Sequence, residues 1–325
     1  MINVGILGVG KYLPERILTN ADLEKMVDTT DEWITTRTGI KERRIAKDSE
    51  STSDLAAFAA RDALDAANMK PEDIGLLIVA TITPDMFFPS TACIVQNKIG
   101  AKNAACFDIS AACSGYIYGM ATAVQFIKND VYKNSLVIGA EKLSSITDWQ
   151  DRNTCVLFGD GAGASILGST AKNSIVSIHL GADGSRGDLL NMPAGGSKIP
   201  ATHKSVDDRL HFLKMEGSEV FKIAVKVMVD AAVKAVNGFG LKPEDISLVI
   251  PHQANLRILL AVAKRMGLSE DKIYLNIEKY GNMSGASTAV ALTDAVREGR
   301  IKKGDIVVLD AFGSGLTWGA IVIKW

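Results

Sequence analysis

The chain has 325 residues, of which 47% are hydrophobic and 22% are charged, a balance typical of a globular protein with one large core or two medium ones. Because 36 basic side chains are offset by 37 acidic ones, the overall charge gives no reason to expect nucleic acid or an anionic membrane as the main partner. The start of the chain lacks a secretory signal pattern, and no stretch approaches the roughly 18 apolar residues of a membrane span, so we expect a cytoplasmic protein.

The first element contains closely spaced glycines, in the run Gly5-Ile6-Leu7-Gly8-Val9-Gly10. Such spacing occurs in nucleotide-binding turns, where a helix follows the last glycine. Here Tyr12-Leu13-Pro14 follow instead. We therefore do not interpret this segment as a nucleotide site.

Short apolar runs alternate with Ala-rich stretches of helical spacing along the rest of the chain. This alternation predicts an α/β fold with strands buried on both faces. The apolar runs are 76–79, 135–138, 248–250 and 306–309. Between the ordered segments, residues 183–217 are rich in Gly, Ser, Asp and Lys, and we expect them to cross the surface.

Parts of this pattern occur twice. Lys70-Pro71-Glu72-Asp73 and its following strand return 172 residues later at Lys242. Two further pairs, 133–138 with 303–308 and the weaker 161–167 with 317–323, keep similar offsets. Lys-Pro-Glu-Asp could recur simply as a helix-start signal, but three ordered pairs favour a duplication. We predict two similar halves, residues 1–172 and 173–325.

Cys113 has the setting of an activated nucleophile. It lies in Ser110-Ala111-Ala112-Cys113-Ser114-Gly115, small residues that lead directly into a helical pattern. The free N–H groups and dipole of a helix N-terminus favour thiolate over thiol, and small neighbours leave room for a carbonyl group. A cysteine among apolar residues is also commonly core, which is our prediction for Cys93, Cys106 and Cys155. None of the four has the CxxC spacing of a zinc site.

His252 and Asn282 are polar residues at element ends in the second half. His252 follows the strand 248–250, and its counterpart in the first half is Ala80. Because ligands bind at strand ends in layered α/β folds, different residues at equivalent points indicate one site built between the halves. Asn282 opens an Ala/Val helix in Gly281-Asn282-Met283, where it could equally be a helix cap.

Two Gly-rich segments, 158–164 and 312–319, occupy comparable late positions in the halves. Neither ends in the Gly-Lys-Ser/Thr of a phosphate-binding loop. Their remaining use is close backbone approach, including N–H groups directed at an oxyanion.

With these residues in this order, the chain resembles the third class of 3-oxoacyl-(acyl-carrier-protein) synthases, of the thiolase superfamily, over essentially its full length. The matching segments are Thr29-Thr30-Asp31-Glu32-Trp33-Ile34, Arg37-Thr38-Gly39-Ile40, Ala111-Ala112-Cys113-Ser114-Gly115, Asp151-Arg152-Asn153-Thr154-Cys155, Phe158-Gly159-Asp160-Gly161-Ala162-Gly163, Pro251-His252-Gln253-Ala254-Asn255 and Gly281-Asn282. The resemblance implies a five-layer α-β-α-β-α thiolase fold and a homodimer. It also implies the start of fatty acid synthesis, by decarboxylative condensation of a short acyl-CoA with malonyl-carrier protein.

The family's catalytic roles fall on three residues. Cys113 would carry the acyl group, while His252 and Asn282 would hydrogen-bond the thioester oxygen of the malonyl group as carbon dioxide leaves. A second oxyanion would lie against the backbone N–H groups of Cys113 and Ser314. The resemblance implies no metal and no cofactor beyond the coenzyme A thioester that serves as substrate.

The resemblance also implies binding residues. Trp33 and Arg152 match the pair that holds the adenine of coenzyme A, and Thr29, Arg37 and Asn255 match polar contacts along that substrate. Phe88 matches a residue that borders the partner subunit's acyl pocket. A basic patch for the acidic carrier protein would contain Lys222, Arg257, Lys264 and Arg265, although a solvated helix face is the simpler interpretation.

Two departures from the family pattern affect these expectations. Ser314 stands where a glycine is common, so its backbone donor survives only if the local φ suits a residue with a Cβ. Met283-Ser284-Gly285-Ala286 replaces a Thr-Ser-Ala-Ala run beside Asn282. Rival hypotheses are an enzyme of this fold that condenses or transfers acyl groups in secondary metabolism, a cysteine thioesterase and a non-catalytic acyl-binding protein.

Overall fold

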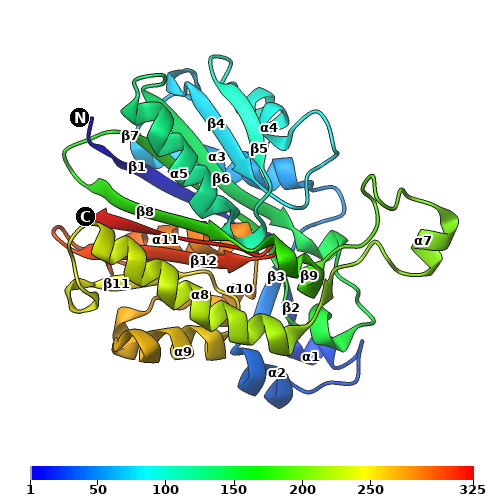
Figure 1. The fold of residues 1–325 in the computed structure, drawn as a ribbon. Helices are drawn as coiled ribbons and strands as arrows, with labels where there is room; N and C mark the ends of the chain where they lie inside the picture. The colour runs from blue at the N-terminus through cyan, green and yellow to red at the C-terminus, as the bar shows by residue number, and fades with distance from the viewer. Residues whose placement is uncertain (1) are drawn as a thin grey trace.

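The computed structural model describes residues 2–325, and its frame is a pair of β-sheets with two helices between them (Figure 1). The first sheet has the strand order β1-β7-β6-β4-β5, and the second has the order β11-β12-β13-β8. The strands of the first are β1 (Val4–Tyr12), β4 (Leu76–Ala80), β5 (Ala105–Ile109), β6 (Asn134–Lys142) and β7 (Asp160–Ser169). Those of the second are β8 (Ser174–Ala182), β11 (Leu248–Pro251), β12 (Ile306–Gly313) and β13 (Thr317–Lys324).

Helices cover both faces of each sheet. The two between the sheets are α5 (Gly115–Lys128) and α11 (Gly285–Arg297). Outside the first sheet lie α3 (Thr52–Ala67) and α4 (Thr91–Ile99), and outside the second lie α8 (Gly217–Gly238) and α9 (Leu256–Met266). This arrangement confirms the predicted five-layer fold.

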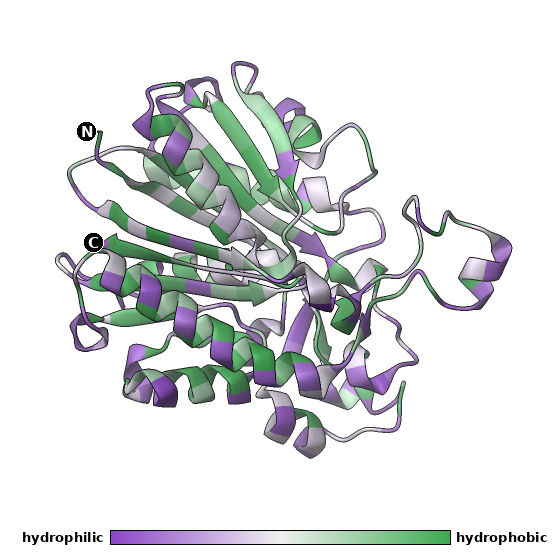
Figure 2. Cartoon of the chain, in the orientation of Figure 1, coloured by the Kyte–Doolittle hydropathy of each residue, from purple (hydrophilic) through white to green (hydrophobic). Residues whose placement is uncertain are grey.

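The burial of these layers follows from their sequence patterns. A central core joins both sheets to α5 and α11, and each outer helical layer has a core of its own with its sheet. All five residues of β4 are buried, as expected for a parallel strand that is covered on both faces. The outer helices α8 and α9 alternate hydrophilic and hydrophobic stretches in Figure 2, because only one side of each faces a sheet.

The two sheets repeat one topology. The short 3-10 turns Pro71–Asp73 and Pro243–Asp245 begin in the same way, with Asp73 and Asp245 accepting from the backbone N–H of Lys70 and Lys242 at 2.9 and 2.8 Å. They lead into β4 and β11, which hold equivalent positions, and β6 and β12, β7 and β13, and β1 and β8 correspond likewise. The first sheet adds β5 at its edge.

A smaller layer of short elements lies beside the ends of the sheets. It comprises β2 (Arg16–Thr19), β3 (Glu42–Ile45), α1 (Asn20–Leu23), α2 (Asp31–Thr38), α6 (Arg152–Cys155) and α10 (Ile277–Tyr280). The segment predicted to cross the surface holds η4 (Gly184–Leu189), β9 (Leu190–Asn191), α7 (His203–Asp207) and β10 (Lys214–Met215). Figure 1 shows α7 projecting from the body of the protein.

Two further expectations can be compared with the fold. The glycines at 5, 8 and 10 lie within β1, with β2 rather than a helix after them. Cys155 is buried as predicted, but the core prediction is wrong for Cys93, which is exposed on α4, and Cys106 is only partly buried in edge strand β5. Among residues 2–325, no helix is long and apolar enough to span a membrane.

Candidate active site

Cys113 lies at the start of the central helix of the first half, as predicted. It forms a 3-10 turn with Ala112 and Ser114, and α5 begins at the next residue. Ala112 has a φ of 45°, a left-handed conformation that is costly for a residue with a Cβ and that clusters at functional sites. This turn brings the Cys113 side chain out of line with β5 and toward the second half.

The protonation state of Cys113 differs from the expectation for a helix N-terminus. Burial raises the pKa of its thiol to about 12, with the Ser284 hydroxyl acting in the opposite direction and the Glu141 charge raising the pKa further. The residue is only 8% exposed, so loss of solvation outweighs the favourable end of the helix. The resting side chain is therefore a thiol, and its reaction requires a proton acceptor.

His252 follows β11 and is 1% exposed. Its backbone N–H donates to the Asp310 carbonyl of β12 at 2.7 Å, which fixes the residue at the end of the parallel pair. Burial lowers the pKa of His252 to about 3, so the imidazole is neutral at physiological pH. Its Nδ1 atom is buried without a hydrogen-bond partner among residues 2–325.

Asn282 is held by both its backbone and its side chain. Its N–H donates to the Leu157 carbonyl at 2.9 Å, and its own carbonyl accepts from Gly159 at 3.0 Å. The Oδ1 atom accepts from the backbone N–H of Ser284 at 2.8 Å. Because the carboxamide oxygen is occupied, the amide NH₂ remains as the group available to a ligand.

The turn that contains Asn282 meets the Cys113 turn across the boundary between the sheets. Ser284 has a φ of 47° and stands 172 residues after Ala112, so strained residues at equivalent points precede both central helices. A Cβ at Gly285 would lie 3.3 Å from the Ala112 carbonyl oxygen, which shows how closely the two turns approach. The Ser284 hydroxyl adjoins the Cys113 thiol and lowers its pKa.

A second contact between the halves comes from the turn after β12. A Cβ at Gly313 would lie 2.6 Å from the Cys113 backbone nitrogen, so only glycine allows the approach seen here. The Thr317 hydroxyl oxygen is 3.0 Å from the carbonyl oxygens of both Ala111 and Ser314. Ser314 is absent from the positive-φ residues of the described chain, so its side chain does not strain the turn and its N–H can serve as a donor.

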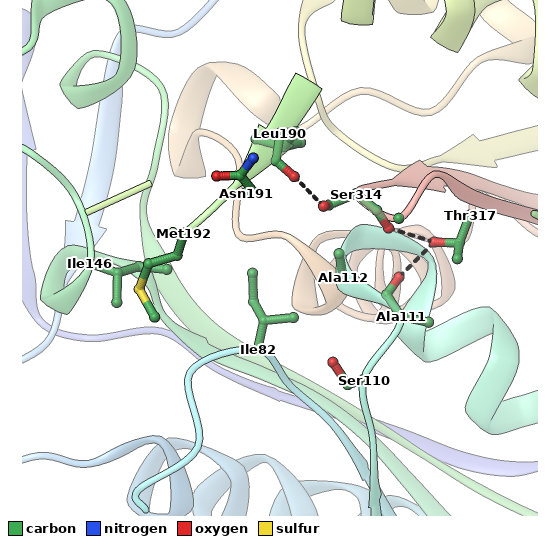
Figure 3. Close-up of a pocket in the computed structure, with 11 residues that line it drawn as sticks. Ile82, Ser110, Ala111, Ala112, Ile146, Leu190, Asn191, Met192, Ser314 and Thr317 are labelled. Carbon is green, nitrogen blue, oxygen red and sulfur yellow. Dashed lines mark hydrogen bonds between the residues drawn. The ribbon is translucent and has the colours of Figure 1, made fainter. Parts of the chain in front are cut away.

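A cavity of about 330 Å³ adjoins these turns (Figure 3). Cys113 is not among its lining residues, but Ala111 and Ala112 are. The lining consists of Ile82, Ser110, Ala111, Ala112, Ile146, Leu190, Asn191, Met192, Ser314, Gly315 and Thr317. The Ser314 hydroxyl donates to the Leu190 carbonyl, which joins the turn to strand β9 at the cavity wall. The size is that of a small-molecule site, and most of the lining side chains are apolar.

The residues expected to contact coenzyme A lie near one another. The guanidinium groups of Arg152 and Arg37 are 4.4 and 5.0 Å from the centroid of the Trp33 ring. Asn255 caps α9 by accepting from the Arg257 N–H, and its Nδ2 donates to the Arg37 carbonyl at 3.0 Å. The structure therefore connects α2, α6 and the N-terminus of α9.

Thr29 and Asn255 differ in how free they are for a ligand. The Thr29 hydroxyl is buried and has no partner among the described residues. Asn255 uses both ends of its carboxamide within the protein, so a ligand contact by this side chain would have to replace one of them.

The four basic residues expected to dock a carrier protein are all exposed, on two adjacent helices. Arg257, Lys264 and Arg265 lie on α9, and Lys222 lies on α8. The Arg257 guanidinium is 5.4 Å from the ring centroid of Phe221, the residue before Lys222. Lys222 also pairs with Glu219 at 2.7 Å, which reduces its share of the positive field.

Phe88 lies on the loop between β4 and α4 and is 84% exposed, beside Phe87 at 81%. Consecutive exposed aromatic side chains are unusual on a monomer surface and indicate an interaction site. Strand β5 is at the edge of its sheet, and Ala105 to Ile109 are each at least partly exposed. An unpaired edge with apolar side chains is likewise a surface for another chain.

Sequence reasoning missed Glu141, which lies at the end of β6 and is fully buried. Burial raises its pKa to about 7, against hydrogen bonds from Thr83, Ile82, Ser284 and Thr81. One signal was available, because a carboxyl group closes the otherwise small and apolar run 135–140 at a strand end. No group of three or more His, Cys, Asp or Glu side chains in residues 2–325 is arranged to hold a metal ion.

The chain was compared with known families and proteins. Residues 107–184 match the sequence profile of 3-oxoacyl-[acyl-carrier-protein (ACP)] synthase III, and residues 237–325 match that of its C-terminal part. The beta-ketoacyl-[acyl-carrier-protein] synthase III of Caldanaerobacter subterraneus subsp. tengcongensis is 62% identical over 100% of this chain and 98% of the relative. The Clostridioides difficile protein of the same name is 57% identical over 99% of this chain and 98% of the relative.

Solved structures of similar fold agree. The 3-oxoacyl-[acyl-carrier-protein] synthase III of Aquifex aeolicus VF5 has a TM-score of 0.92 and 49% identity, covering 99% of this chain and 100% of that one. A priming beta-ketosynthase from the R1128 polyketide biosynthetic pathway has a TM-score of 0.92 and 34% identity, covering 99% of this chain and 96% of that one.

Proposed function

Because the chain belongs to the 3-oxoacyl-(acyl-carrier-protein) synthase III family, we propose that Cys113, His252 and Asn282 are its catalytic residues. The protein is a condensing acyltransferase that starts fatty acid synthesis by joining an acyl-CoA to malonyl-acyl-carrier protein. The observation that carries the assignment is the contact between the Cys113 turn of one half and the Asn282–Ser284 turn of the other. This contact is what a site assembled between two halves requires.

The first half-reaction acylates Cys113. The sulfur attacks the thioester carbonyl of acyl-CoA, the bond between that carbonyl carbon and the coenzyme A sulfur breaks, and coenzyme A leaves as a thiol. The negative oxygen of the tetrahedral intermediate lies against the backbone N–H groups of Cys113 and Ser314. Such donors act where charge develops, and each is typically worth a factor of order 10² to 10³ in rate.

The second half-reaction removes carbon dioxide from the malonyl group. Cleavage of the carbon–carbon bond leaves its electron pair on the thioester as an enolate. The Asn282 NH₂ group and an N–H of the neutral His252 ring donate to the enolate oxygen. Its carbon attacks the acyl-Cys113 carbonyl, and collapse of that intermediate releases 3-oxoacyl-carrier protein and restores the Cys113 sulfur.

The cavity of about 330 Å³ beside Cys113 is the proposed pocket for a short acyl starter. Ile82, Ile146 and Met192 give it apolar walls, which suit an alkyl chain and offer no partner to a charged one. The identity of 49% to the Aquifex aeolicus enzyme against 34% to the polyketide priming enzyme supports a role in primary fatty acid synthesis.

Several binding assignments belong to the same proposal. Trp33 and Arg152 bind the adenine of coenzyme A, with Thr29, Arg37 and Asn255 along the rest of that substrate. Lys222, Arg257, Lys264 and Arg265 dock the acidic carrier protein. The chain forms a homodimer through β5 and the loop of Phe88, acts in the cytoplasm, and requires no metal or cofactor.

The division of the chain into residues 1–172 and 173–325 is also part of the proposal. It is supported by the strands, because the first sheet uses strands up to Ser169 and the second begins with β8 at Ser174. The first half then supplies the nucleophile, and the second supplies the histidine and asparagine.

Product analysis with acetyl-CoA and malonyl-carrier protein tests the function. The expected product is 3-oxobutanoyl-carrier protein, formed with one carbon dioxide and one free coenzyme A. Acyl transfer without a new carbon–carbon bond, or net hydrolysis of the thioester, would replace the condensing assignment by a transferase or a thioesterase. A protein that never carries an acyl group on Cys113 would be an acyl-binding protein instead.

A further inference from the structure

Glu141 is a buried carboxyl group that neither the two half-reactions nor an ion pair accounts for. It is fully buried, and no Lys, Arg or His side chain in the described residues forms a salt bridge with it. A buried carboxylate without a cation is costly unless hydrogen bonds replace the lost water. Its surroundings therefore indicate what the group is for.

Donors from the loop after β4 surround this carboxyl group. The Thr83 hydroxyl donates to Oε2 at 2.6 Å, the Thr81 hydroxyl donates at 3.2 Å, and the Ile82 N–H lies 3.3 and 3.2 Å from the two oxygens. These bonds stabilise the ionised form, whereas burial stabilises the neutral form. The balance brings the pKa of Glu141 to about 7, so both forms are accessible near neutral pH.

On its other side the carboxyl group faces the active site. Ser284 adjoins both side chains, and its hydroxyl lowers the pKa of the Cys113 thiol and that of Glu141. That hydroxyl has no hydrogen-bond partner of standard geometry within residues 2–325, so it is free to turn toward either neighbour. It therefore stands between a thiol that must lose a proton and a carboxylate that can accept one.

The other groups around Glu141 do not compete for this proton. On β6 the next residue, Lys142, directs its ammonium group to the carbonyl oxygens of Lys47 and Glu50, at 2.9 and 2.6 Å. Gly161 of β7 is paired with Glu141 and has no side chain. His252, from the end of β11, has a pKa lowered to about 3 by burial, so it is a weak base.

We propose that Glu141 accepts the Cys113 proton through the Ser284 hydroxyl as the acyl-enzyme forms. The inference rests on the proposed function, since acyl-Cys113 is the product of this step. The thiol proton moves to Ser284 Oγ, the Ser284 proton moves to the Glu141 carboxylate, and the sulfur electron pair forms the bond to the acyl carbon. The proton returns by the same route to the departing coenzyme A sulfur, so the step is balanced.

Electrostatics favours this transfer over ionisation of the thiol alone. The Glu141 charge raises the pKa of Cys113, because two negative charges in one buried site repel each other. Moving one proton from sulfur to carboxylate leaves the number of buried charges unchanged. Glu141 is thus a positioning residue for the proton, while Cys113 and Ser284 touch the reacting atoms.

The test is the pH dependence of Cys113 reactivity, measured by intact mass with both iodoacetamide and acetyl-CoA. In the unaltered protein the rate should rise with pH through an inflection near 7 and then level off, because the reactive proton arrangement exists only after one proton has left the pair. Glu141→Gln keeps the shape of the side chain but cannot accept the proton. Its rate should rise steadily toward the pKa of the thiol, and acylation at pH 7 should fall by about 10²-fold.

Two further variants separate the relay from a structural role. Thr83→Val keeps the carboxyl group but removes a donor that stabilises its ionised form, so the inflection should move to higher pH. Ser284→Ala keeps Glu141 but breaks the route, so its profile should match that of Glu141→Gln, even if the latter folds poorly. Malonyl decarboxylation should stay within about threefold in Glu141→Gln, because that step transfers no proton from Cys113.

A wild-type plateau in Glu141→Gln or Ser284→Ala would overturn the relay. Failure of acetyl-CoA to acylate the unaltered protein, with a normal alkylation profile, would instead count against the proposed function and leave the relay intact. The two ideas can therefore fail separately.

Discussion

The Arg152 guanidinium stacks 4.4 Å from the centroid of the Trp33 ring, and a hydrogen bond of 2.8 Å to the Asp28 carbonyl holds it there. An adenine inserted between the two side chains would have to displace the guanidinium outward. The pair is therefore a closed clamp whose two faces, one aromatic and one cationic, both suit a purine ring.

We expect Trp33→Ala to raise the KM for acetyl-CoA about five- to tenfold with little change in kcat, since an exposed stacking contact is worth about 1 kcal/mol. Trp33→Phe, which keeps an aromatic face, should lie between the two. Steady-state kinetics at fixed malonyl-carrier protein measures the effect. A fall in kcat at unchanged KM would mean that Trp33 supports the catalytic turns and not the substrate.

The three catalytic residues should divide the half-reactions between them. Cys113→Ala should abolish the acyl-enzyme but retain some malonyl decarboxylation. His252→Ala and Asn282→Ala should each slow decarboxylation by a factor of order 10² to 10³ and spare acylation, because their donors act on the enolate oxygen. Intact mass follows the first step and carbon dioxide release follows the second. Equal losses in both steps for all three variants would contradict this division.

The basic face of α9 should matter for one substrate only. Arg257→Ala is expected to raise the KM for malonyl-carrier protein several-fold at low salt and less at high salt, because exposed charges are screened. The KM for acetyl-CoA should not change. Lys128→Ala, which removes an exposed lysine at the end of α5, is the matched control. Equal effects of the two variants would indicate general charge attraction and not a docking patch.

Asp310 should make stability fall as the pH rises. Its carboxyl oxygens are buried without partners in the described chain, and burial raises its pKa well above 3.8. The group therefore stays neutral in the folded protein at pH values where the unfolded chain has ionised it. Its favourable contribution is complete below about pH 3.8 and declines above that value by up to about 1.4 kcal/mol per pH unit, until the folded-state pKa is passed.

Asp310→Asn should remove that decline, so the gain in unfolding free energy over the unaltered protein should grow from pH 4.5 to pH 7. Denaturant titrations across this range measure it. Asp188→Asn, at an exposed carboxyl group, should show no such trend. If Asp310→Asn followed the slope of the unaltered protein, the carboxyl group would have to be ionised in the folded state.

Ser314→Gly tests the family departure at the second oxyanion site. The hydroxyl joins its turn to Leu190, so its loss should lower the free energy of unfolding by about 1 kcal/mol. Acylation should change less than twofold, because the backbone N–H is retained. Thermal unfolding and the acyl-enzyme burst measure the two effects. A large loss of acylation would show that the Leu190 contact, and not the N–H alone, sets the geometry.

The sequence alone determined the architecture and the identity of the catalytic residues. Repeated strands such as 76–79 and 248–250 predicted two equivalent sheets, because their apolar runs can be buried only between layers. Cys113, His252 and Asn282 could be named because each stands at an element end within a distinctive local pattern. Chemistry that depends on neighbours in the chain was therefore within reach.

Only the tertiary structure decided the protonation states and the contacts between halves. Local pattern predicted a thiolate at Cys113, but burial among residues of the other half keeps the thiol protonated. Glu141 and Ser284 lie 143 residues apart in the chain, and nothing in either segment shows that they flank one sulfur. Desolvation and proton transfer act over a few ångströms in space, so they depend on packing that brings distant segments together, which no single stretch of sequence contains.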